Sequence, residues 1–227
     1  AELSGGRIDP TVAPLMDLWD FTGQAADKNA QKKIPAAADI QALLPHINYK
    51  NILIDGNTVT LTDPQTQVDL GFIAKGFIAD RLKESLLEKG VESALINLGG
   101  NILAVGSKPD GSPFEIGVRK PFDTQNTALT TLSLSDERYF EKDGKRYHHL
   151  LDPFTGYPVE NGLLGVTILS SSSMEGDALS TTAFVLGPEE GMALIESLPD
   201  TEAVFITEDY KLHYSSGLSG KQSAQNP

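Results

Sequence analysis

Two oxygen-bearing side chains near the start of one predicted helix have the spacing of a cation site. Asp177 and Thr181 are four residues apart in a helix predicted over residues 175–186, so they lie one above the other on a single face. A carboxylate and a hydroxyl are hard ligands, and protein-bound Mg²⁺ takes one or two carboxylates beside water and phosphate oxygens. In the alternative interpretation, Asp177 only interacts favourably with the helix N-terminus while Thr181 packs inward.

Two adjacent histidines are candidates for acid–base chemistry. His148 and His149 lie on a strand predicted over residues 146–151, which runs into the turn sequence Asp152-Pro-Phe-Thr-Gly156. Adjacent strand residues face opposite sides, so at most one of the histidines faces any given site. A histidine there could act as a general base near neutral pH. As isolated residues, both are more often ordinary strand or surface histidines.

A helix predicted to continue from the Val68–Asp80 stretch to about Lys89 is the element that could bring a ligand close to the backbone. Gly71 and Gly76 bracket its first turn, where a glycine costs roughly 1 kcal/mol relative to alanine. Such glycines are favoured where the backbone passes close to a bulky group, or where its amides and carbonyls face a ligand. Lys75, between them, could then reach an anion. A glycine-softened helix entry without a ligand is the other interpretation.

The same helix carries an apolar stripe that predicts one buried face, followed by Gly90 as a C-terminal cap. The next predicted strand, residues 91–98, ends in Asn97-Leu-Gly-Gly-Asn101. This sequence predicts either a sharp turn with exposed backbone amides or a bulge between two strand segments. The stripe consists of Ile73, Phe77, Ile78, Leu82 and Leu86.

Strands and helices mix along the chain without strict βαβ alternation, which predicts an α+β fold with mixed, largely antiparallel sheets and packed helices. We expect a single domain over residues 1–214 and a polar, disordered tail over residues 215–227. The other predicted helices cover residues 14–21, 36–44 and 188–198; the other predicted strands cover residues 49–54, 58–62, 102–105, 114–119, 128–135, 164–170, 203–207 and 211–214.

The composition excludes several classes of partner and chemistry. The formal net charge of −13, with no basic cluster, argues against nucleic acid and against anionic lipid as partners. The chain has no cysteine, which excludes disulfides and thiolate metal sites. No run approaches the roughly 18 apolar residues that a membrane-spanning helix needs.

The order and spacing of six short motifs resemble the ApbE-like FAD:protein FMN transferases. The set covers nearly the whole chain, and it is the ordered set rather than any single motif that is specific. Family members typically extend upstream of the Ser-Gly-Gly stretch near the N-terminus, so we expect this chain to lack the family's first segment. The motifs are Asp9-Pro-Thr-Val, Asp69-Leu-Gly-x-Ile-Ala-Lys-Gly76 with Asp80, Ile96-Asn-Leu-Gly-Gly-Asn101, His149-Leu-Leu-Asp-Pro-x-Thr-Gly-Tyr-Pro158, Asp177-Ala-Leu-x-Thr181 and Phe184-Val-Leu-Gly187.

The resemblance implies a Mg²⁺-dependent enzyme that splits the pyrophosphate of FAD and transfers FMN to a threonine or serine hydroxyl of an acceptor redox protein, releasing AMP. It assigns the metal ligands to the backbone carbonyl of Ala74, the carboxylate of Asp177 and the hydroxyl of Thr181. It makes His149 the candidate for activating the acceptor hydroxyl. It also implies FAD contacts at Lys75, Asp80, Asn97, Gly100, Asn101 and Thr155.

Two other functions use the same residues. A metal-dependent pyrophosphatase would release FMN and AMP with water as acceptor, and a storage protein would bind FAD without chemistry. Retention of Asp177, Thr181 and His149 together disfavours storage. One departure from the family pattern, Leu132-Ser-Leu-Ser135 in place of Thr-Ser-Gly-Asp, bears on acceptor recognition. By kinship we expect an extracytoplasmic location, with membrane association only through a lipid anchor upstream of this chain.

Overall fold

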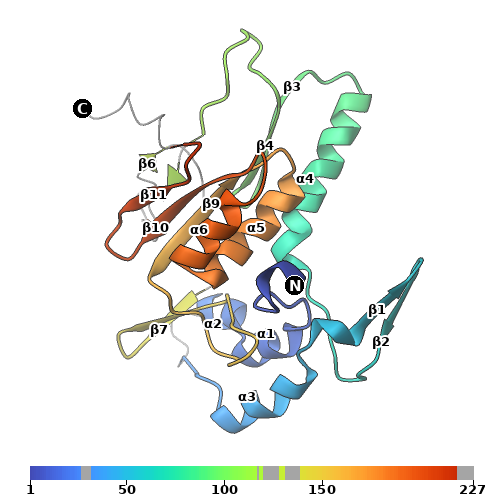
Figure 1. The fold of residues 1–227 in the computed structure, drawn as a ribbon, viewed down its shortest axis with the longest axis vertical. Helices are drawn as coiled ribbons and strands as arrows, with labels where there is room; N and C mark the ends of the chain where they lie inside the picture. Colours follow the sequence, from blue (N-terminus) through green and yellow to red (C-terminus); the bar gives the residue numbers. More distant parts are fainter. Residues whose placement is uncertain (27–31, 117, 120–127, 131–138, 219–227) are drawn as a thin grey trace. The chain divides into compact units, whose positions relative to one another are not determined.

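The computed structural model describes residues 1–26, 32–116, 118–119, 128–130 and 139–218. The chain divides into two compact units, each described by itself (Figure 1). The first unit comprises residues 1–70 and 137–160, and the second comprises residues 71–136 and 161–227. Helices and antiparallel strand pairs occur in both, which confirms the α+β prediction. The grouping of residues 1–214 into a single domain stays a prediction.

The first unit is built around an aromatic core. Trp19 stacks on Phe21 at 5.4 Å between ring centroids and on Tyr147 at 5.8 Å, and Phe140 packs beside them. The helical elements are η1 (Glu2–Ser4), α1 (Ala13–Trp19), α2 (Phe21–Ala26), α3 (Ala37–Leu43), η2 (Leu44–His46) and η3 (Tyr49–Asn51); the strands form two hairpins, β1 (Ile52–Asp55) with β2 (Thr58–Leu61) and β7 (Tyr139–Lys142) with β8 (Lys145–His148).

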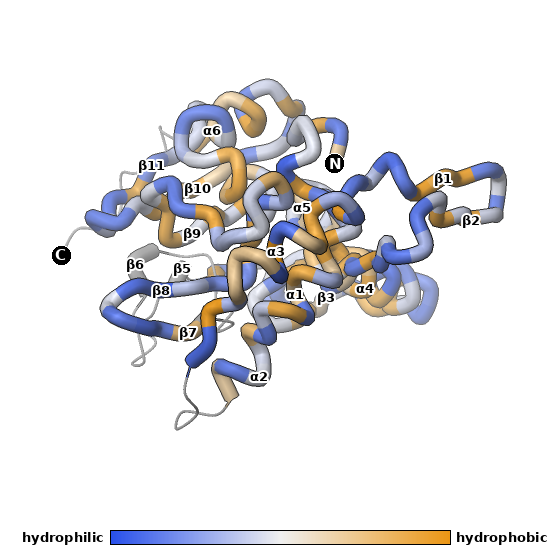
Figure 2. The backbone as a smooth tube through the Cα atoms, turned by 90° about the horizontal axis from the view of Figure 1, so that it is seen from below, coloured by the Kyte–Doolittle hydropathy of each residue, from blue (hydrophilic) through white to orange (hydrophobic). Residues whose placement is uncertain are grey.

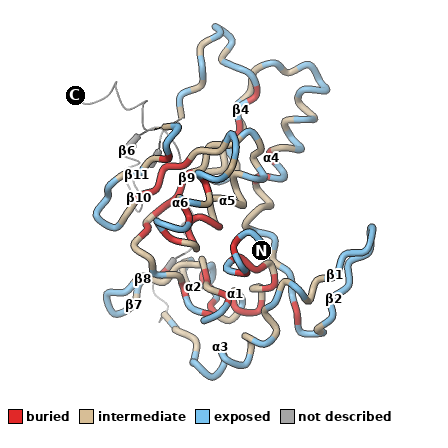
Figure 3. The backbone as a smooth tube through the Cα atoms, viewed as in Figure 1, coloured by how far each residue is buried: buried red, intermediate tan, exposed pale blue. Residues whose placement is uncertain are grey.

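The β1–β2 hairpin joins two of the predicted strands, those over residues 49–54 and 58–62, and the Asp55-Gly56 pair between them is typical of a hairpin turn. Its register places four apolar side chains on one face, and exposed residues run along both strands (Figure 3). Ile54 is 73% exposed and Val59, directly opposite, is 62% exposed. Figure 2 shows hydrophobic stretches along both strands. The four residues are Ile52, Ile54, Val59 and Leu61.

The second unit contains a three-stranded antiparallel sheet in the order β11–β10–β9, with α5 packed against β9 and α6 against β10 (Figure 1). Helix α4 packs along α5 and against the β3–β4 hairpin. The elements are α4 (Gly71–Glu88), β3 (Ser93–Leu98), β4 (Asn101–Gly106), β5 (Val118–Arg119), β6 (Ala128–Thr130), β9 (Leu163–Leu169), α5 (Ser173–Leu186), α6 (Pro188–Glu196), β10 (Glu202–Thr207) and β11 (Leu212–Tyr214).

The apolar stripe of α4 does not form the buried face that its periodicity predicts. Phe77, Ile78 and Leu82 are 49%, 48% and 42% exposed, whereas the buried residues of this helix are Gly76 and Ala79. Small residues face α5 and β4 because they let the backbones come close. The large apolar side chains point elsewhere, and the prediction of a single buried stripe was therefore wrong.

Several local predictions changed in extent. Leu98 pairs with Asn101 across an unshifted β3–β4 register, so the two glycines form a hairpin turn and not a bulge. Within the predicted strand 114–119, the described residues form a strand only at β5, and β7 was not predicted. Residues 131–135, including the Leu132–Ser135 departure, lie outside the described residues.

Part of the predicted tail is packed. Ser215 is buried and pairs with Ala203. The amide of Ser215 donates to the carbonyl of Ala203, and the hydroxyl of Ser215 accepts from the amide of Ala203 at 2.8 Å. Residues 215–218 therefore extend the folded region past β11, while residues 219–227 lie outside the described part. Among the helices that the structure describes, none combines the length and the apolar character required to cross a membrane.

Candidate functional site

Three elements of the second unit bring predicted site residues together. The first turns of α4 carry Ala74 and Lys75, the β3–β4 turn carries Asn101, and the first turns of α5 carry Asp177. The groups that act on the Asp177 carboxylate come from the other two elements, from Lys75 and Gly76 of α4 and from Asn101. Thr181 lies one turn further along α5. Two of the predicted FAD contacts, Lys75 and Asn101, thus act on the carboxylate that is predicted to bind the metal.

Burial is the dominant influence on Asp177. It raises the pKa of this carboxyl group, since a partly buried charge loses hydration. Opposing groups limit the rise: the amide of Gly76 donates to Oδ2 at 2.9 Å, the charge of Lys75 lies nearby, and the side chain of Asn101 forms a hydrogen bond. A half-buried acid with donors on one side is suited to bind a cation on its other side.

Gly76 shows why the glycine is needed at this point of α4. A β-carbon there would lie 2.6 Å from the Cα of Met174 and closer still to the carbonyl oxygen of Ser173. Real β-carbons do not approach other atoms so closely, so only glycine lets α4 contact the start of α5. At Gly76 the backbone does pass close to a neighbour, which is the backbone of α5, and the contact with a ligand stays a prediction.

The β3–β4 turn needs glycine for a different reason. Gly99 and Gly100 have φ angles of 59° and 98°, in the region that favours residues without a β-carbon. The side chain of Asn97 accepts from the amide of Gly100 at 3.1 Å and thereby stabilises the turn. A β-carbon on Gly99 would meet Cδ of Lys75 at 3.9 Å. The turn thus lies against the stem of the lysine predicted to contact FAD.

The start of α5 is held by side chains that the sequence predictions used only in part. Ser172 caps the helix by accepting from the amide of Glu175 at 3.3 Å, and Ser173 donates to Oδ1 of Asn101 at 2.6 Å. Asp80, predicted as an FAD contact, accepts hydrogen bonds from this helix start. Ser172 and Glu175 match the S-x-x-E capping box, a signal that would have placed the helix start correctly.

The donor set fits a hard cation that shares its coordination with phosphate. The predicted ligands are the Asp177 carboxylate, the Thr181 hydroxyl and the Ala74 carbonyl, and the Thr181 hydroxyl has no hydrogen bond among the residues that the structure describes. In the described part of the chain, no three or more histidine, cysteine or acidic side chains lie close enough together to hold a metal ion. A site with one carboxylate forms no such group, and it agrees with the way Mg²⁺ is bound beside substrate phosphates.

The first unit contains the predicted histidines and Thr155. Burial lowers the pKa of His148, and its ring nitrogens lie 2.9 Å from the Val159 carbonyl and 3.3 Å from the Leu150 amide. The neutral imidazole of His148 therefore stabilises the turn that follows β8 through these two contacts. His149 remains the candidate base. Thr155 accepts from the amide of Tyr157 at 3.3 Å within the turn.

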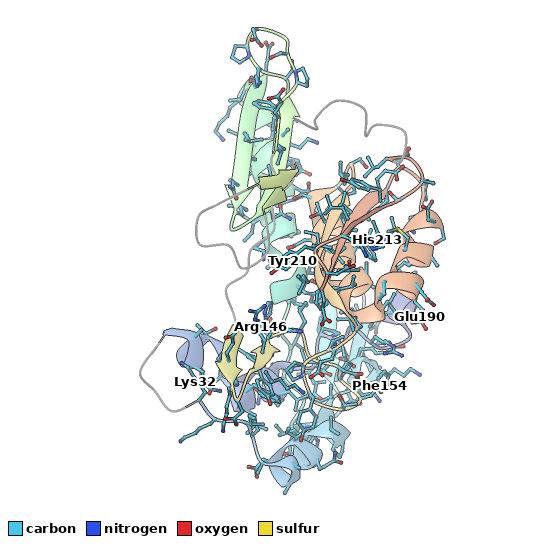
Figure 4. All side chains as sticks on the ribbon, turned by 90° about the vertical axis from the view of Figure 1, so that its left-hand side faces the viewer. Lys32, Arg146, Phe154, Glu190, Tyr210 and His213 are labelled. Atoms are coloured by element: carbon cyan, nitrogen blue, oxygen red, sulfur yellow. The ribbon has the colours of Figure 1, made fainter. Side chains whose placement is uncertain are left out.

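The turn after β8 is fastened to the core of the first unit. Trp19 donates through Nε1 to the carbonyl of Gly156 at 2.8 Å, and a β-carbon on Gly156 would collide with Ile40. Beside this turn, near Phe154, labelled in Figure 4, lies a cavity of about 260 Å³. It is lined by Gly5, Gly6, Asp9, Ile47, Asn48, Tyr49, Lys50, Pro153 and Phe154.

The fold and the site together define an α+β protein in which one half-buried carboxylate, that of Asp177, lies at the contact between helices α4 and α5. The ApbE family model matches residues 1–205. The chain is 39% identical to an FAD:protein FMN transferase of Klebsiella pneumoniae, over 90% of this chain and 65% of that protein. It is 34% identical to a protein of the same name from Treponema pallidum, over 96% of this chain and 65% of that protein.

Solved structures agree with these matches. The crystal structure of the ApbE protein from Thermotoga maritima has a TM-score of 0.83 at 32% identity, covering 99% of this chain and 74% of that one. The flavin transferase ApbE from Vibrio cholerae has a TM-score of 0.80 at 31% identity, covering 96% and 72%. The chain belongs to the ApbE family. It spans just under two thirds of the length of the Klebsiella and Treponema relatives.

Proposed function

We propose that this protein transfers the FMN moiety of FAD to a threonine or serine hydroxyl of an acceptor redox protein, in a Mg²⁺-dependent reaction that releases AMP. The observation that carries the proposal is the half-buried Asp177 carboxylate, held against the glycine-edged start of α4 beside Lys75. Family membership supplies the substrate class, because the Klebsiella and Treponema relatives are named FAD:protein FMN transferases.

The bond changes are those of a phosphoryl-type transfer. The acceptor hydroxyl oxygen forms a bond to the phosphorus on the FMN side of the pyrophosphate. The bond from that phosphorus to the bridging oxygen breaks, and AMP leaves with the bridging oxygen. The hydroxyl proton passes to a base, for which His149 is the candidate. Such reactions depend on alignment of the attacking oxygen and on neutralisation of the phosphate oxygens.

The residues of the second unit would meet those requirements. Asp177, Thr181 and the Ala74 carbonyl would hold Mg²⁺, which supplies a Lewis acid that polarises a phosphate oxygen. Lys75 would neutralise a further oxygen as a point charge. Asn97, Gly100 and Asn101 would shape the turn next to the diphosphate.

A direct test is to incubate the chain with FAD, MgCl₂ and an acceptor redox domain, and to examine a denaturing gel for flavin fluorescence. The Klebsiella relative with the same acceptor serves as positive control. We expect fluorescence on the acceptor with the wild-type chain and none with Asp177→Ala. The exposed neighbour in α5 provides the matched control, Glu175→Ala, which should retain labelling.

The products separate the competing functions. Free FMN and AMP without a labelled acceptor would identify hydrolysis by the same site. Unchanged FAD, under conditions in which the relative labels the acceptor, would contradict both reactions. The proposed extracytoplasmic location, with a lipid anchor outside this chain, is tested separately by fractionating cells that express the native gene.

A further inference from the structure

We propose that Asp80 is a positioning residue whose carboxylate holds the start of α5, so that Asp177 and Thr181 face the first turn of α4. The proposal rests on the proposed function, because it concerns the same cation site. Asp80 lies on α4, and it reaches across to α5 through three hydrogen bonds. Its Oδ1 accepts from the amide of Ser173 at 3.1 Å, and its Oδ2 accepts from the amide of Met174 at 2.9 Å and the hydroxyl of Ser172 at 3.2 Å.

These bonds complete the cap of α5. The first amides of a helix have no partner within the helix, so they need acceptors from elsewhere. Asp80 takes the amides of Ser173 and Met174, and the Ser172 side chain takes that of Glu175. A negative charge at this end also opposes the positive end of the helix dipole. The direction of α5 at its start is thus set by a residue of α4.

A second carboxylate connects the two helices in the opposite direction. Asp177 of α5 accepts from the amide of Gly76 of α4 at 2.9 Å. Gly76 and Asp80 are four residues apart, as are Ser173 and Asp177, so each helix contributes a backbone contact and a carboxylate one turn away. We call these four residues the carboxylate clasp. The hydrogen bonds of the clasp thus connect the position of the Asp177 side chain to the backbone of α4.

A positioning role fits Asp80 better than direct contact with FAD. Both of its oxygens already accept hydrogen bonds from α5. A contact with a ribose hydroxyl would compete with these bonds, and a contact near the diphosphate would place two negative groups together. Its influence on the reaction would therefore pass through the geometry of Asp177 and Thr181. Partners that orient metal ligands typically change metal affinity or activity 10- to 100-fold when they are removed, on the order-of-magnitude scale of known sites.

The test compares Asp80→Ala and Asp80→Asn with the wild-type chain. Glu84→Ala is the matched control, because Glu84 lies one turn further along α4 and its side chain is exposed. Binding of Mn²⁺ without FAD is followed by electron paramagnetic resonance, and amide hydrogen exchange is followed in the metal-free chain. The Mg²⁺ concentration that half-saturates FAD turnover is the third readout.

We expect Asp80→Ala to weaken Mn²⁺ binding about 10- to 100-fold and to raise the half-saturating Mg²⁺ concentration similarly. Turnover at saturating Mg²⁺ should fall much less, because excess metal compensates for misplaced ligands. Asp80→Asn keeps one acceptor oxygen and should lie between the wild type and Asp80→Ala. Exchange should accelerate first at the amides of Ser173 and Met174, even without metal. Glu84→Ala should match the wild type throughout.

The outcomes distinguish this proposal from the proposed function. Wild-type binding of Mn²⁺ that is unchanged in both Asp80 variants would overturn the positioning role alone. The same conclusion follows if metal affinity and exchange at residues 173 and 174 are unaffected while only KM for FAD rises, since that result indicates direct contact. A wild-type chain that binds no Mn²⁺ would contradict the cation site itself, and the positioning role with it.

Discussion

At Asp177, two opposing effects act on the charge of one side chain. Burial favours the protonated form, while the amide of Gly76, the Lys75 ammonium and Asn101 favour the carboxylate, and burial has the larger effect. In the folded protein, the favourable contacts thus offset only part of the cost of burying this charge. A bound cation would offset the rest of this cost, so cation binding would stabilise the folded protein.

The raised pKa of Asp177 predicts how stability changes with pH in the absence of metal. In the folded state, Asp177 stays protonated at pH values above its ordinary pKa of 3.8. The contribution of this group to stability therefore falls as the pH rises from 3.8 through the raised pKa of the folded state. Asp177→Asn removes the charge. In EDTA, we expect its melting temperature to equal that of the wild type at about pH 3 and to exceed it at neutral pH.

Thermal melts across this pH range, with and without MgCl₂, provide the measurement. Magnesium should raise the melting temperature of the wild-type chain and leave Asp177→Asn unchanged, because only the wild type has a carboxylate to bind it. A variant that is less stable than the wild type at every pH in EDTA would show that the amide replacement disrupts the clasp by another route.

At the scale of elements, the contact between α4 and α5 depends on small residues. Gly76 and Ala79 are the buried positions of α4, and Gly76 has no room for a β-carbon beside Ser173. The exposed side of the same helix carries larger apolar groups. Helix α4 is therefore placed by close backbone approach and by two carboxylates, and less by interdigitated large side chains.

This arrangement predicts opposite effects for two glycine substitutions. Gly76→Ala should destabilise the protein by about 1–3 kcal/mol, as overpacking in a close contact does. Gly176→Ala should be neutral or stabilising by up to about 1 kcal/mol, since its β-carbon would meet only the Ser170 hydroxyl at 3.2 Å and alanine favours the helix. Chemical denaturation of both variants is the measurement, and equal losses would contradict the close-approach argument.

The sequence predicted local features well and non-local partners poorly. Asp55-Gly56 gave the first hairpin, Gly90 follows α4 in a left-handed conformation, and the Asp177–Thr181 spacing does place both residues on α5. These features depend on neighbours in the chain. The partner of the α5 cap could not be predicted in the same way, because Asp80 lies more than 90 residues from Ser173. Periodicity also cannot distinguish a buried apolar face from an exposed one, as α4 demonstrates.

For the molecule as a whole, exposed apolar side chains recur in both units. The β1–β2 face and the outer side of α4 each hold several large aliphatic groups, although the net charge of −13 favours solubility. Within the described residues, Ile78 is 48% exposed whereas Leu103 of β4 is 7% exposed. Similar apolar residues thus contribute very differently to the stability of one unit.

Substitution of these two residues tests the difference. Ile78→Lys should change the free energy of unfolding by no more than about 0.5 kcal/mol, as surface substitutions usually do. Leu103→Ala should cost about 2–5 kcal/mol because it leaves a cavity in the core. Denaturant titration gives the free energies, and binding of a hydrophobic dye to the native protein should decrease only in Ile78→Lys. A large loss from Ile78→Lys would place that side chain in a contact absent from this structure.

The aromatic core of the first unit has a practical consequence, since Trp19 is the only tryptophan in the chain. Its indole is fully buried, stacked on neighbouring rings and hydrogen-bonded to the Gly156 carbonyl. Selective excitation of tryptophan therefore monitors the surroundings of that unit alone, whereas circular dichroism averages the backbone of both. Superposition of the two melting curves would mean that the units unfold cooperatively, and separation of the curves would show a partly folded intermediate.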